Sequence, residues 1–133
     1  MLIELVLENT MDTQRLLLVD DRIDVRMTTA AILEDAGYEV IEAGSLGEAR
    51  ALLGAGPGDR SLAAALVDVH LGDESGLELV PALRKHHPRA AVVLFTGSGA
   101  EQELGGADAM LSKGIHPEEM IAHVARLIAE RNR

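Results

Sequence analysis

A chain of 133 residues is long enough for one domain with a single hydrophobic core. Its 12 lysines and arginines are outnumbered by 22 aspartates and glutamates, and the formal charge of −10 argues against a nucleic-acid-binding surface, which needs cationic contacts to phosphate. There is no cysteine, and no apolar run approaches the roughly 20 residues that a membrane-spanning helix needs. We therefore expect a cytoplasmic protein with no membrane partner and no direct nucleic-acid partner.

The first 14 residues precede the clear pattern of the chain. Residues 2–7 are apolar except for Glu4, and they fit an edge strand, a short helix or an extension upstream of a second start at Met11. The sequence leaves these alternatives open. We treat residues 1–14 as an N-terminal extension and residues 15–133 as the domain.

From Arg15 onward, short apolar runs alternate with amphipathic helices. Each run of aliphatic residues ends at a polar or glycine-containing loop, which is typical of a buried strand. We expect strands at residues 16–19, 38–41, 62–67, 90–95 and 108–112.

The first two helices follow the first two strands. Asp24 is the expected N-cap of the first helix, and Gly37 is the expected residue that stops it. Apolar residues at helical spacing over 46–53 predict the second helix.

The later helices carry their own start signals. Ser75 and Glu78 form the pattern of a capping box, which predicts a helix running to about His86, and Pro81 inside it is expected to bend it. Residues 99–105 have room for about one helical turn, and the last helix is expected to begin at Pro117.

Strands that alternate with helices predict parallel strands joined by right-handed crossovers. The predicted fold class is therefore α/β, a flavodoxin-like three-layer sandwich with a five-stranded parallel sheet of order 2-1-3-4-5. In that order the first, third, fourth and fifth strands are neighbours, so the residues at their carboxyl ends meet at one edge.

Four of these strand ends carry polar residues, namely Asp20 with Asp21, then Asp68, Thr96 and Lys113. Carboxylates about 5 Å apart repel one another by roughly 3 kcal/mol at an effective dielectric near 20, so they take up protons or hold a cation. An all-oxygen pocket suits Mg²⁺. With that charge offset, Asp68 can act as a nucleophile towards a phosphoryl group, while Lys113 and Thr96 contact its oxygens.

The same stretches resemble the receiver domain of bacterial two-component response regulators, of the chemotaxis-regulator type. The matching stretches are residues 16–21, 66–72 with Gly76 following, 94–97 and 106–113. The resemblance implies that Asp68 accepts a phosphoryl group from the phosphohistidine of a histidine kinase. It also implies that Asp21, Asp68 and the backbone carbonyl of His70 hold Mg²⁺, with Asp20 assisting through water. Thr96 would move towards the attached phosphoryl group, and Lys113 would pair with it.

The chain departs from the family pattern in four places. Gly114 and Gly72 stand where the family often has proline, and Met110 stands where an aromatic switch residue is usual. The span of 113 − 96 = 17 positions between Thr96 and Lys113 is shorter than in typical relatives. We therefore expect a truncated fourth helix and an output surface that differs from the usual one.

The predicted function is that of a phosphorylatable receiver with no output domain of its own, which signals through protein partners or by phosphorelay. Its expected partners are a histidine kinase or phosphotransfer protein and a downstream protein target, and a homodimer stays open. We expect no enzyme activity beyond self-phosphorylation and autodephosphorylation.

Two other functions fit parts of the pattern. A small phosphohydrolase could use Asp68 as nucleophile, but the haloacid-dehalogenase type has an acid two residues later, where this chain has His70. A flavin-binding module would need a hydroxyl-rich phosphate loop after the first strand, where Asp20 and Asp21 would repel phosphate.

Overall fold

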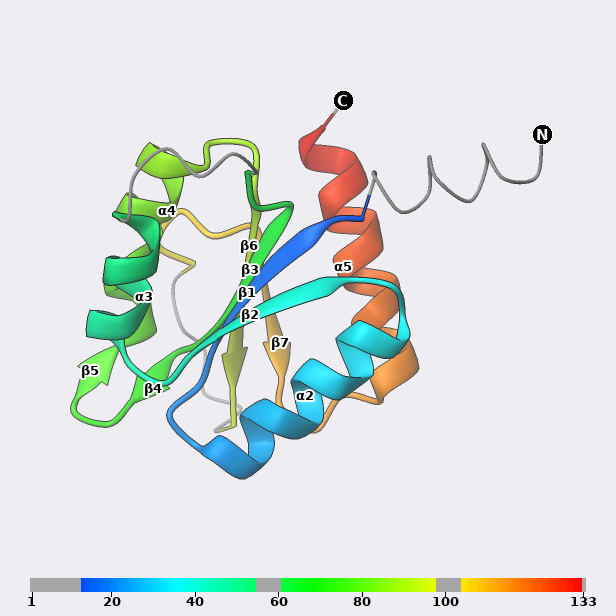
Figure 1. Cartoon of the computed structure of the whole chain (residues 1–133), viewed down its shortest axis with the longest axis horizontal. Helices are drawn as coiled ribbons and strands as arrows, with labels where there is room; N and C mark the ends of the chain where they lie inside the picture. The colour runs from blue at the N-terminus through cyan, green and yellow to red at the C-terminus, as the bar shows by residue number, and fades with distance from the viewer. Residues whose placement is uncertain (1–12, 55–60, 98–103, 133) are drawn as a thin grey trace.

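The computed structural model describes residues 13–54, 61–97 and 104–132 (Figure 1). The alternatives for residues 2–7 therefore lie outside the described residues, as does most of 99–105. In chain order the elements are β1 (Arg15–Val19), α2 (Ile23–Asp35), β2 (Glu39–Ala43), α3 (Leu46–Leu53), β3 (Ala64–Asp68), β4 (His70–Leu71), β5 (Glu74–Ser75), the 3₁₀ helix η1 (Gly76–Leu79), α4 (Val80–His86), β6 (Ala91–Thr96), β7 (Ala109–Ser112) and α5 (Pro117–Arg131).

The main sheet has five parallel strands in the order β2-β1-β3-β6-β7. This is the predicted order 2-1-3-4-5, because β4 and β5 form a separate two-stranded hairpin. The predicted α/β fold class is confirmed. All the strands of the main sheet end at one edge, the lower edge in Figure 1.

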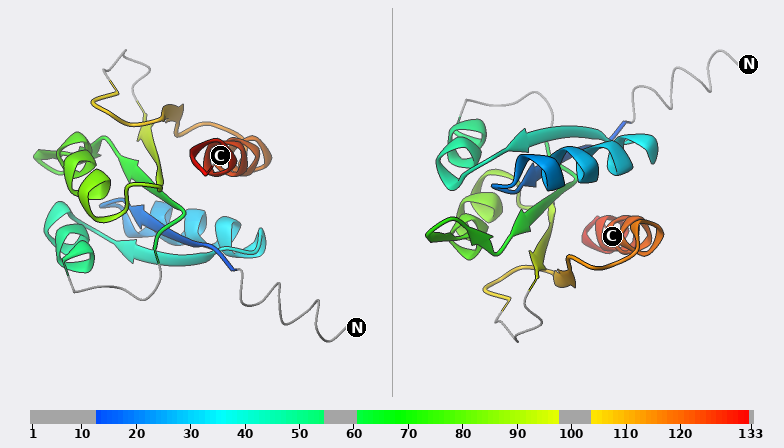
Figure 2. Two further views of the ribbon diagram at one scale, coloured as in Figure 1. Left: turned by 90° about the horizontal axis from the view of Figure 1, so that it is seen from above. Right: turned by 90° about the horizontal axis from the view of Figure 1, so that it is seen from below.

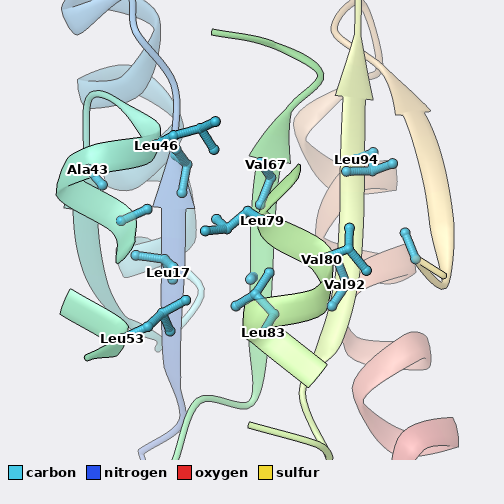
Figure 3. Packing of buried hydrophobic residues seen from close by; sticks show 14 of the residues in the cluster. Leu17, Ala43, Leu46, Leu53, Val67, Leu79, Val80, Leu83, Val92 and Leu94 are labelled. Atoms are coloured by element: carbon cyan, nitrogen blue, oxygen red, sulfur yellow. The ribbon is translucent and has the colours of Figure 1, made fainter. Parts of the chain in front are cut away.

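The sheet is covered on both faces, which makes three layers. Helices α3 and α4 lie on one face and α2 and α5 on the other (Figure 2). Successive strand residues alternate between the two cores: Leu17 and Val67 pack towards α3 and α4, whereas Leu16 and Leu66 pack towards α2 and α5. Figure 3 shows the core between the sheet and helices α3 and α4, where Leu79 and Leu83 contact the sheet. Because β1, β3 and β6 are buried on both faces, these three strands are near-continuous apolar runs, as is typical of parallel sheets.

The start of α2 differs from the prediction. The N-cap is Arg22, which makes no side-chain cap, and Asp24 lies in the first turn. The prediction failed because the Asp20 carboxylate already accepts the Arg22 N–H at 2.9 Å, so the helix begins earlier. Gly37 has the predicted stopping role, with φ +101 directly after the C-cap residue Ala36.

The segment after Ser75 also differs from the prediction. The capping box of Ser75 and Glu78 is present, but it begins the 3₁₀ helix η1, and α4 starts only at Val80. Pro81 therefore stands in the first turn of α4, where its missing N–H has no helical partner to lose. The prediction that Pro81 removes a hydrogen bond inside the helix is therefore wrong.

The connection from β6 to β7 contains no helix in its described part, residues 104–108. Most of the segment predicted to hold a truncated fourth helix falls on residues 98–103, outside the described residues. In the part of the chain that the structure describes, no helix is long and apolar enough to span a membrane.

The base of β7 is held by the carboxylate of Asp108. Its Oδ2 accepts from Arg84 Nη2 and from the Val92 N–H, both at 2.8 Å. Arg84 also donates to the carbonyl oxygens of Ala90 and Gly106. These contacts join α4, β6 and β7 at the edge of the sheet opposite the polar strand ends.

His87 follows α4 and receives a backbone hydrogen bond. Its Nδ1 accepts the Leu62 N–H at 3.2 Å, which requires an unprotonated nitrogen. Burial lowers the pKa of His87 from its ordinary value of 6.5, and the nearby His86 and Arg15 lower it further. The neutral ring is the form that fits the folded chain.

This lowered pKa predicts a loss of stability in mild acid. The folded chain binds fewer protons than the unfolded chain near pH 6, so the contribution of His87 is complete above pH 6.5 and is lost as the pH falls through the lowered pKa. We expect the melting temperature of the wild type to fall more between about pH 7.5 and about pH 5.5 than that of His87→Gln, which keeps an acceptor without titrating. Equal falls in the two proteins would contradict this assignment.

Candidate functional site

The polar residues predicted at the strand ends come together at one edge of the sheet. Asp68 is the last residue of β3, Asp20 and Asp21 follow β1, Thr96 ends β6 and Lys113 follows β7. The parallel register aligns these ends, and the Lys113 N–H donates to the Thr96 carbonyl oxygen at 3.0 Å. The convergence follows from the strand order alone, because β1, β3, β6 and β7 are consecutive neighbours.

The three aspartates form a tight cluster. Asp20, Asp21 and Asp68 each offer a carboxylate oxygen, and these oxygens all lie within 4.8 Å of one another. Asp20 is 6% exposed and Asp68 is 3% exposed, whereas Asp21 is open to solvent. Two of the three negative charges are therefore largely out of water, which strengthens their mutual repulsion.

The Asp20 carboxylate is held between stabilising and destabilising neighbours. Burial raises the pKa of Asp20, and the charges of Asp68 and Asp21 raise it further. The hydrogen bond from the Arg22 N–H and the charge of Lys113, whose Nζ lies 3.8 Å from Asp20 Oδ2, act in the opposite direction. The net effect is a raised pKa of Asp20, so its charged form is disfavoured in the absence of a cation.

Asp68 makes the closest ionic contact of the cluster. Its Oδ2 lies 2.5 Å from Lys113 Nζ, and its Oδ1 accepts the His70 N–H at 3.0 Å. A Cβ at Gly76 would come within 2.0 Å of the Asp68 carbonyl oxygen, so only glycine fits behind this residue. Both carboxylate oxygens of Asp68 are thus fixed by neighbours, and the main chain behind them is tightly packed.

Asp21 is held by a residue that departs from the family pattern. Its Oδ2 accepts the N–H of Gly72 at 3.1 Å, and Gly72 has φ +62. Proline, which the pattern often has at this place, has no N–H to donate and cannot adopt that φ. Sequence reasoning missed this contact, although the glycine in place of proline was its visible signal.

The other predicted residues are placed as follows. Thr96 is 6% exposed at the end of β6, and Met110 is half-buried and packs against the core beneath α3 and α4. His70 is exposed and begins the β4–β5 hairpin, which sequence analysis did not predict. The metal-binding role of the His70 carbonyl stays a prediction. His116 is exposed and His123 is half-buried.

The donor set fits a hard divalent cation. Three carboxylates within 4.8 Å offer only oxygen ligands, and one of them faces solvent, so a bound ion could keep several waters. A cavity of about 350 Å³ adjoins the cluster between α2 and α5, and Asp20 and Lys113 are among its lining residues.

The sequence of this chain matches one protein family and several curated proteins. The family described as the response regulator receiver domain matches residues 16–125. The photosynthetic apparatus regulatory protein RegA of Rhodobacter capsulatus is 36% identical over 85 residues, covering 64% of this chain and 44% of that protein. The chain spans about half the length, or less, of the curated relatives that it matches first.

Two solved structures extend the comparison to the fold. A CheY-like receiver domain protein from Methanospirillum hungatei has 30% identity and a TM-score of 0.79, covering 91% of this chain and 98% of that chain. A response regulator from Burkholderia pseudomallei, described with a phosphorylated aspartic acid, a calcium ion and citrate, has 30% identity and a TM-score of 0.73. That match covers 88% of this chain and 69% of that chain.

The crowding of the aspartates predicts a metal-dependent stability. Asp21→Asn removes one negative charge and keeps an oxygen that can accept the Gly72 N–H. Without divalent metal, we expect this variant to melt about 4 °C above the wild type, which corresponds to about 1 kcal/mol. Thermal melts in the presence of a chelator would measure this difference.

Addition of Mg²⁺ completes the test. It should raise the melting temperature of the wild type and have little effect on Asp21→Asn, because a bound cation stabilises only the state that binds it. Asp73→Asn, a change of the same kind at an exposed residue of the β4–β5 hairpin, is the matched control and should respond to Mg²⁺ as the wild type does. Metal-independent melting of the wild type would contradict the shared-cation geometry.

Proposed function

This chain belongs to the response regulator receiver domain family of two-component signalling systems, and we propose that it works by accepting a phosphoryl group on Asp68. The observation that carries the proposal is the position of Asp68. It is a buried carboxylate at the end of a central strand, within 4.8 Å of two further carboxylate groups and in contact with Lys113. The donor would be the phosphohistidine of a histidine kinase or of a phosphotransfer protein.

The chemistry assigned to Asp68 is nucleophilic. A carboxylate oxygen attacks phosphorus, the new P–O bond forms as the P–N bond to the donor imidazole breaks, and the imidazole nitrogen keeps the electron pair. Lys113 then pairs with a phosphoryl oxygen, and the Thr96 hydroxyl donates to another. The short Lys113–Asp68 contact supports this role, because the ammonium group is already at the acceptor.

We assign the metal to the acidic cluster. Asp21, Asp68 and the backbone carbonyl of His70 would hold Mg²⁺, with Asp20 assisting through water. The ion would offset the charge of the carboxylates and of the incoming phosphoryl oxygens. The Burkholderia pseudomallei relative is described with a phosphorylated aspartic acid and a calcium ion, which is in keeping with this assignment.

The partners follow from the family. Receiver domains pair with histidine kinases and with downstream effectors, and residues 15–133 would form such a domain with residues 1–14 as an extension. We propose a cytoplasmic signalling module that passes its state to a protein target or relays the phosphoryl group onward, with a homodimer as one form of output. Such a module has no turnover beyond its own phosphorylation and dephosphorylation.

Labelling by a small phosphodonor tests this function. With acetyl phosphate and Mg²⁺, we expect one acid-stable, base-labile phosphoryl group per wild-type chain by intact-mass spectrometry, and none on Asp68→Asn. Beryllofluoride with Mg²⁺ should likewise shift the amide resonances of residues near Asp68, Thr96 and Lys113 in the wild type only.

Two controls separate the alternatives. Asp73→Asn alters an exposed aspartate five residues after Asp68 and should label like the wild type. Hydrolysis of phosphate esters in large molar excess over the protein would favour the phosphohydrolase instead. Labelling of Asp68→Asn at the wild-type level would overturn the assignment of the acceptor.

A further inference from the structure

We propose that Arg26 is a positioning residue for the acidic cluster, because it fixes the main chain that carries the Asp20 carboxylate. The inference rests on the proposed function, since it concerns how the same cluster binds a divalent cation. It was not foreseen from the sequence, where Arg26 is one polar residue among several on the first helix.

The contacts of Arg26 lead to Asp20 and to the neighbouring strand. Its Nη1 donates to the main-chain carbonyl oxygen of Asp20 at 2.9 Å, and its Nε donates to Glu42 Oε1 at 3.1 Å. The Arg26 side chain is only 17% exposed, unlike that of Arg22, which is 65% exposed. The guanidinium group therefore bridges the end of β1 and the end of β2.

The main chain of Asp20 is held from both sides. Its N–H donates to the Ala43 carbonyl oxygen at 3.1 Å, and its own carbonyl oxygen accepts from Arg26. With the main chain fixed, the short aspartate side chain has few positions left, and the Arg22 N–H selects one of them by donating to Oδ1. The place of the Asp20 oxygens relative to Asp21 and Asp68 is thus set by these three contacts.

Gly44 leaves the space that the guanidinium group occupies. A Cβ at Gly44 would lie 2.8 Å from Arg26 Nη1 and 3.7 Å from its Cζ, closer than a real contact allows for Nη1. The φ of Gly44 lies outside the left-handed region, so alanine fits the backbone there. Gly44→Ala therefore displaces the guanidinium group while it keeps the charge of Arg26.

Two possible roles for Arg26 predict opposite changes in the Mg²⁺ affinity of Arg26→Ala. If Arg26 acted only through its charge, Arg26→Ala would strengthen Mg²⁺ binding by removing a cation near a cation site. Arg26→Lys and Gly44→Ala would then bind Mg²⁺ like the wild type. If Arg26 positions Asp20, all three variants weaken Mg²⁺ binding, because lysine lacks the planar fork that joins the two acceptors.

The experiment measures Mg²⁺ affinity of the full chain without phosphodonor, by isothermal titration calorimetry or by the amide shift of Gly72. We expect about tenfold weaker binding for Arg26→Ala, the size of effect usual for residues that orient metal ligands, and several-fold weaker binding for Arg26→Lys and Gly44→Ala. Arg126→Ala is the matched control, because Arg126 pairs with Glu130 at the same 3.1 Å but far along the chain on α5. It should bind Mg²⁺ like the wild type.

A second readout separates positioning from a general loss of structure. The Mg²⁺ concentration that gives half the maximal rate of labelling by acetyl phosphate should rise in the Arg26 and Gly44 variants, while the rate at saturating Mg²⁺ stays within about twofold of the wild type. Where Arg26→Ala fails to fold by circular dichroism, Gly44→Ala and Arg26→Lys decide the matter.

The possible results distinguish a failure of the positioning role from a failure of the proposed function. Tighter Mg²⁺ binding by Arg26→Ala, or wild-type binding by Gly44→Ala and Arg26→Lys, would overturn the positioning role and leave the function of Asp68 standing. A wild type that neither binds Mg²⁺ nor accepts label at Asp68 would overturn the proposed function, and the positioning role with it.

Discussion

Repulsion among three carboxylates is the constraint on which the site depends. Their oxygens lie within 4.8 Å of one another, and Asp20 and Asp68 are removed from water. A fold keeps such an arrangement only if it supplies compensating charge, and here Lys113 does so at 2.5 Å from Asp68. One ammonium group cannot balance three carboxylates, so we expect the cluster to favour a further cation.

The rest of the molecule serves to bring these groups to one edge. Five parallel strands with apolar residues on both faces leave the carboxyl ends as the place where polar side chains can gather. Gly76 allows η1 to approach the back of Asp68, and Gly72 offers an N–H to Asp21. Both glycines act through the backbone, in positions where a side chain or a proline ring would break the contact.

Much of this was predictable from sequence, for a physical reason. Buried strands and their polar ends leave a strong local signal, so the strand order and the meeting of Asp20, Asp21, Asp68, Thr96 and Lys113 could be foreseen. Contacts that depend on which of several neighbouring groups forms a hydrogen bond could not be predicted from the sequence. The N-cap of α2 is Arg22 and not Asp24, and Pro81 stands in the first turn of α4, after the 3₁₀ helix η1. The two-residue strands β4 and β5 have no periodic pattern, and the bond from Arg26 to a main-chain oxygen depends on the packing of α2 against β2.

The anchoring of β7 by Asp108 bears on how a change at Lys113 can spread through the domain. Because Arg84 and the Val92 N–H hold the carboxylate at the start of the strand, β7 cannot slide along β6 without breaking several bonds at once. A four-residue strand that is anchored just before its first residue moves most easily at its last residue. A displacement of Lys113 would therefore be taken up first by the loop that leads into α5, while the contacts of Asp108 at the other end of β7 are kept.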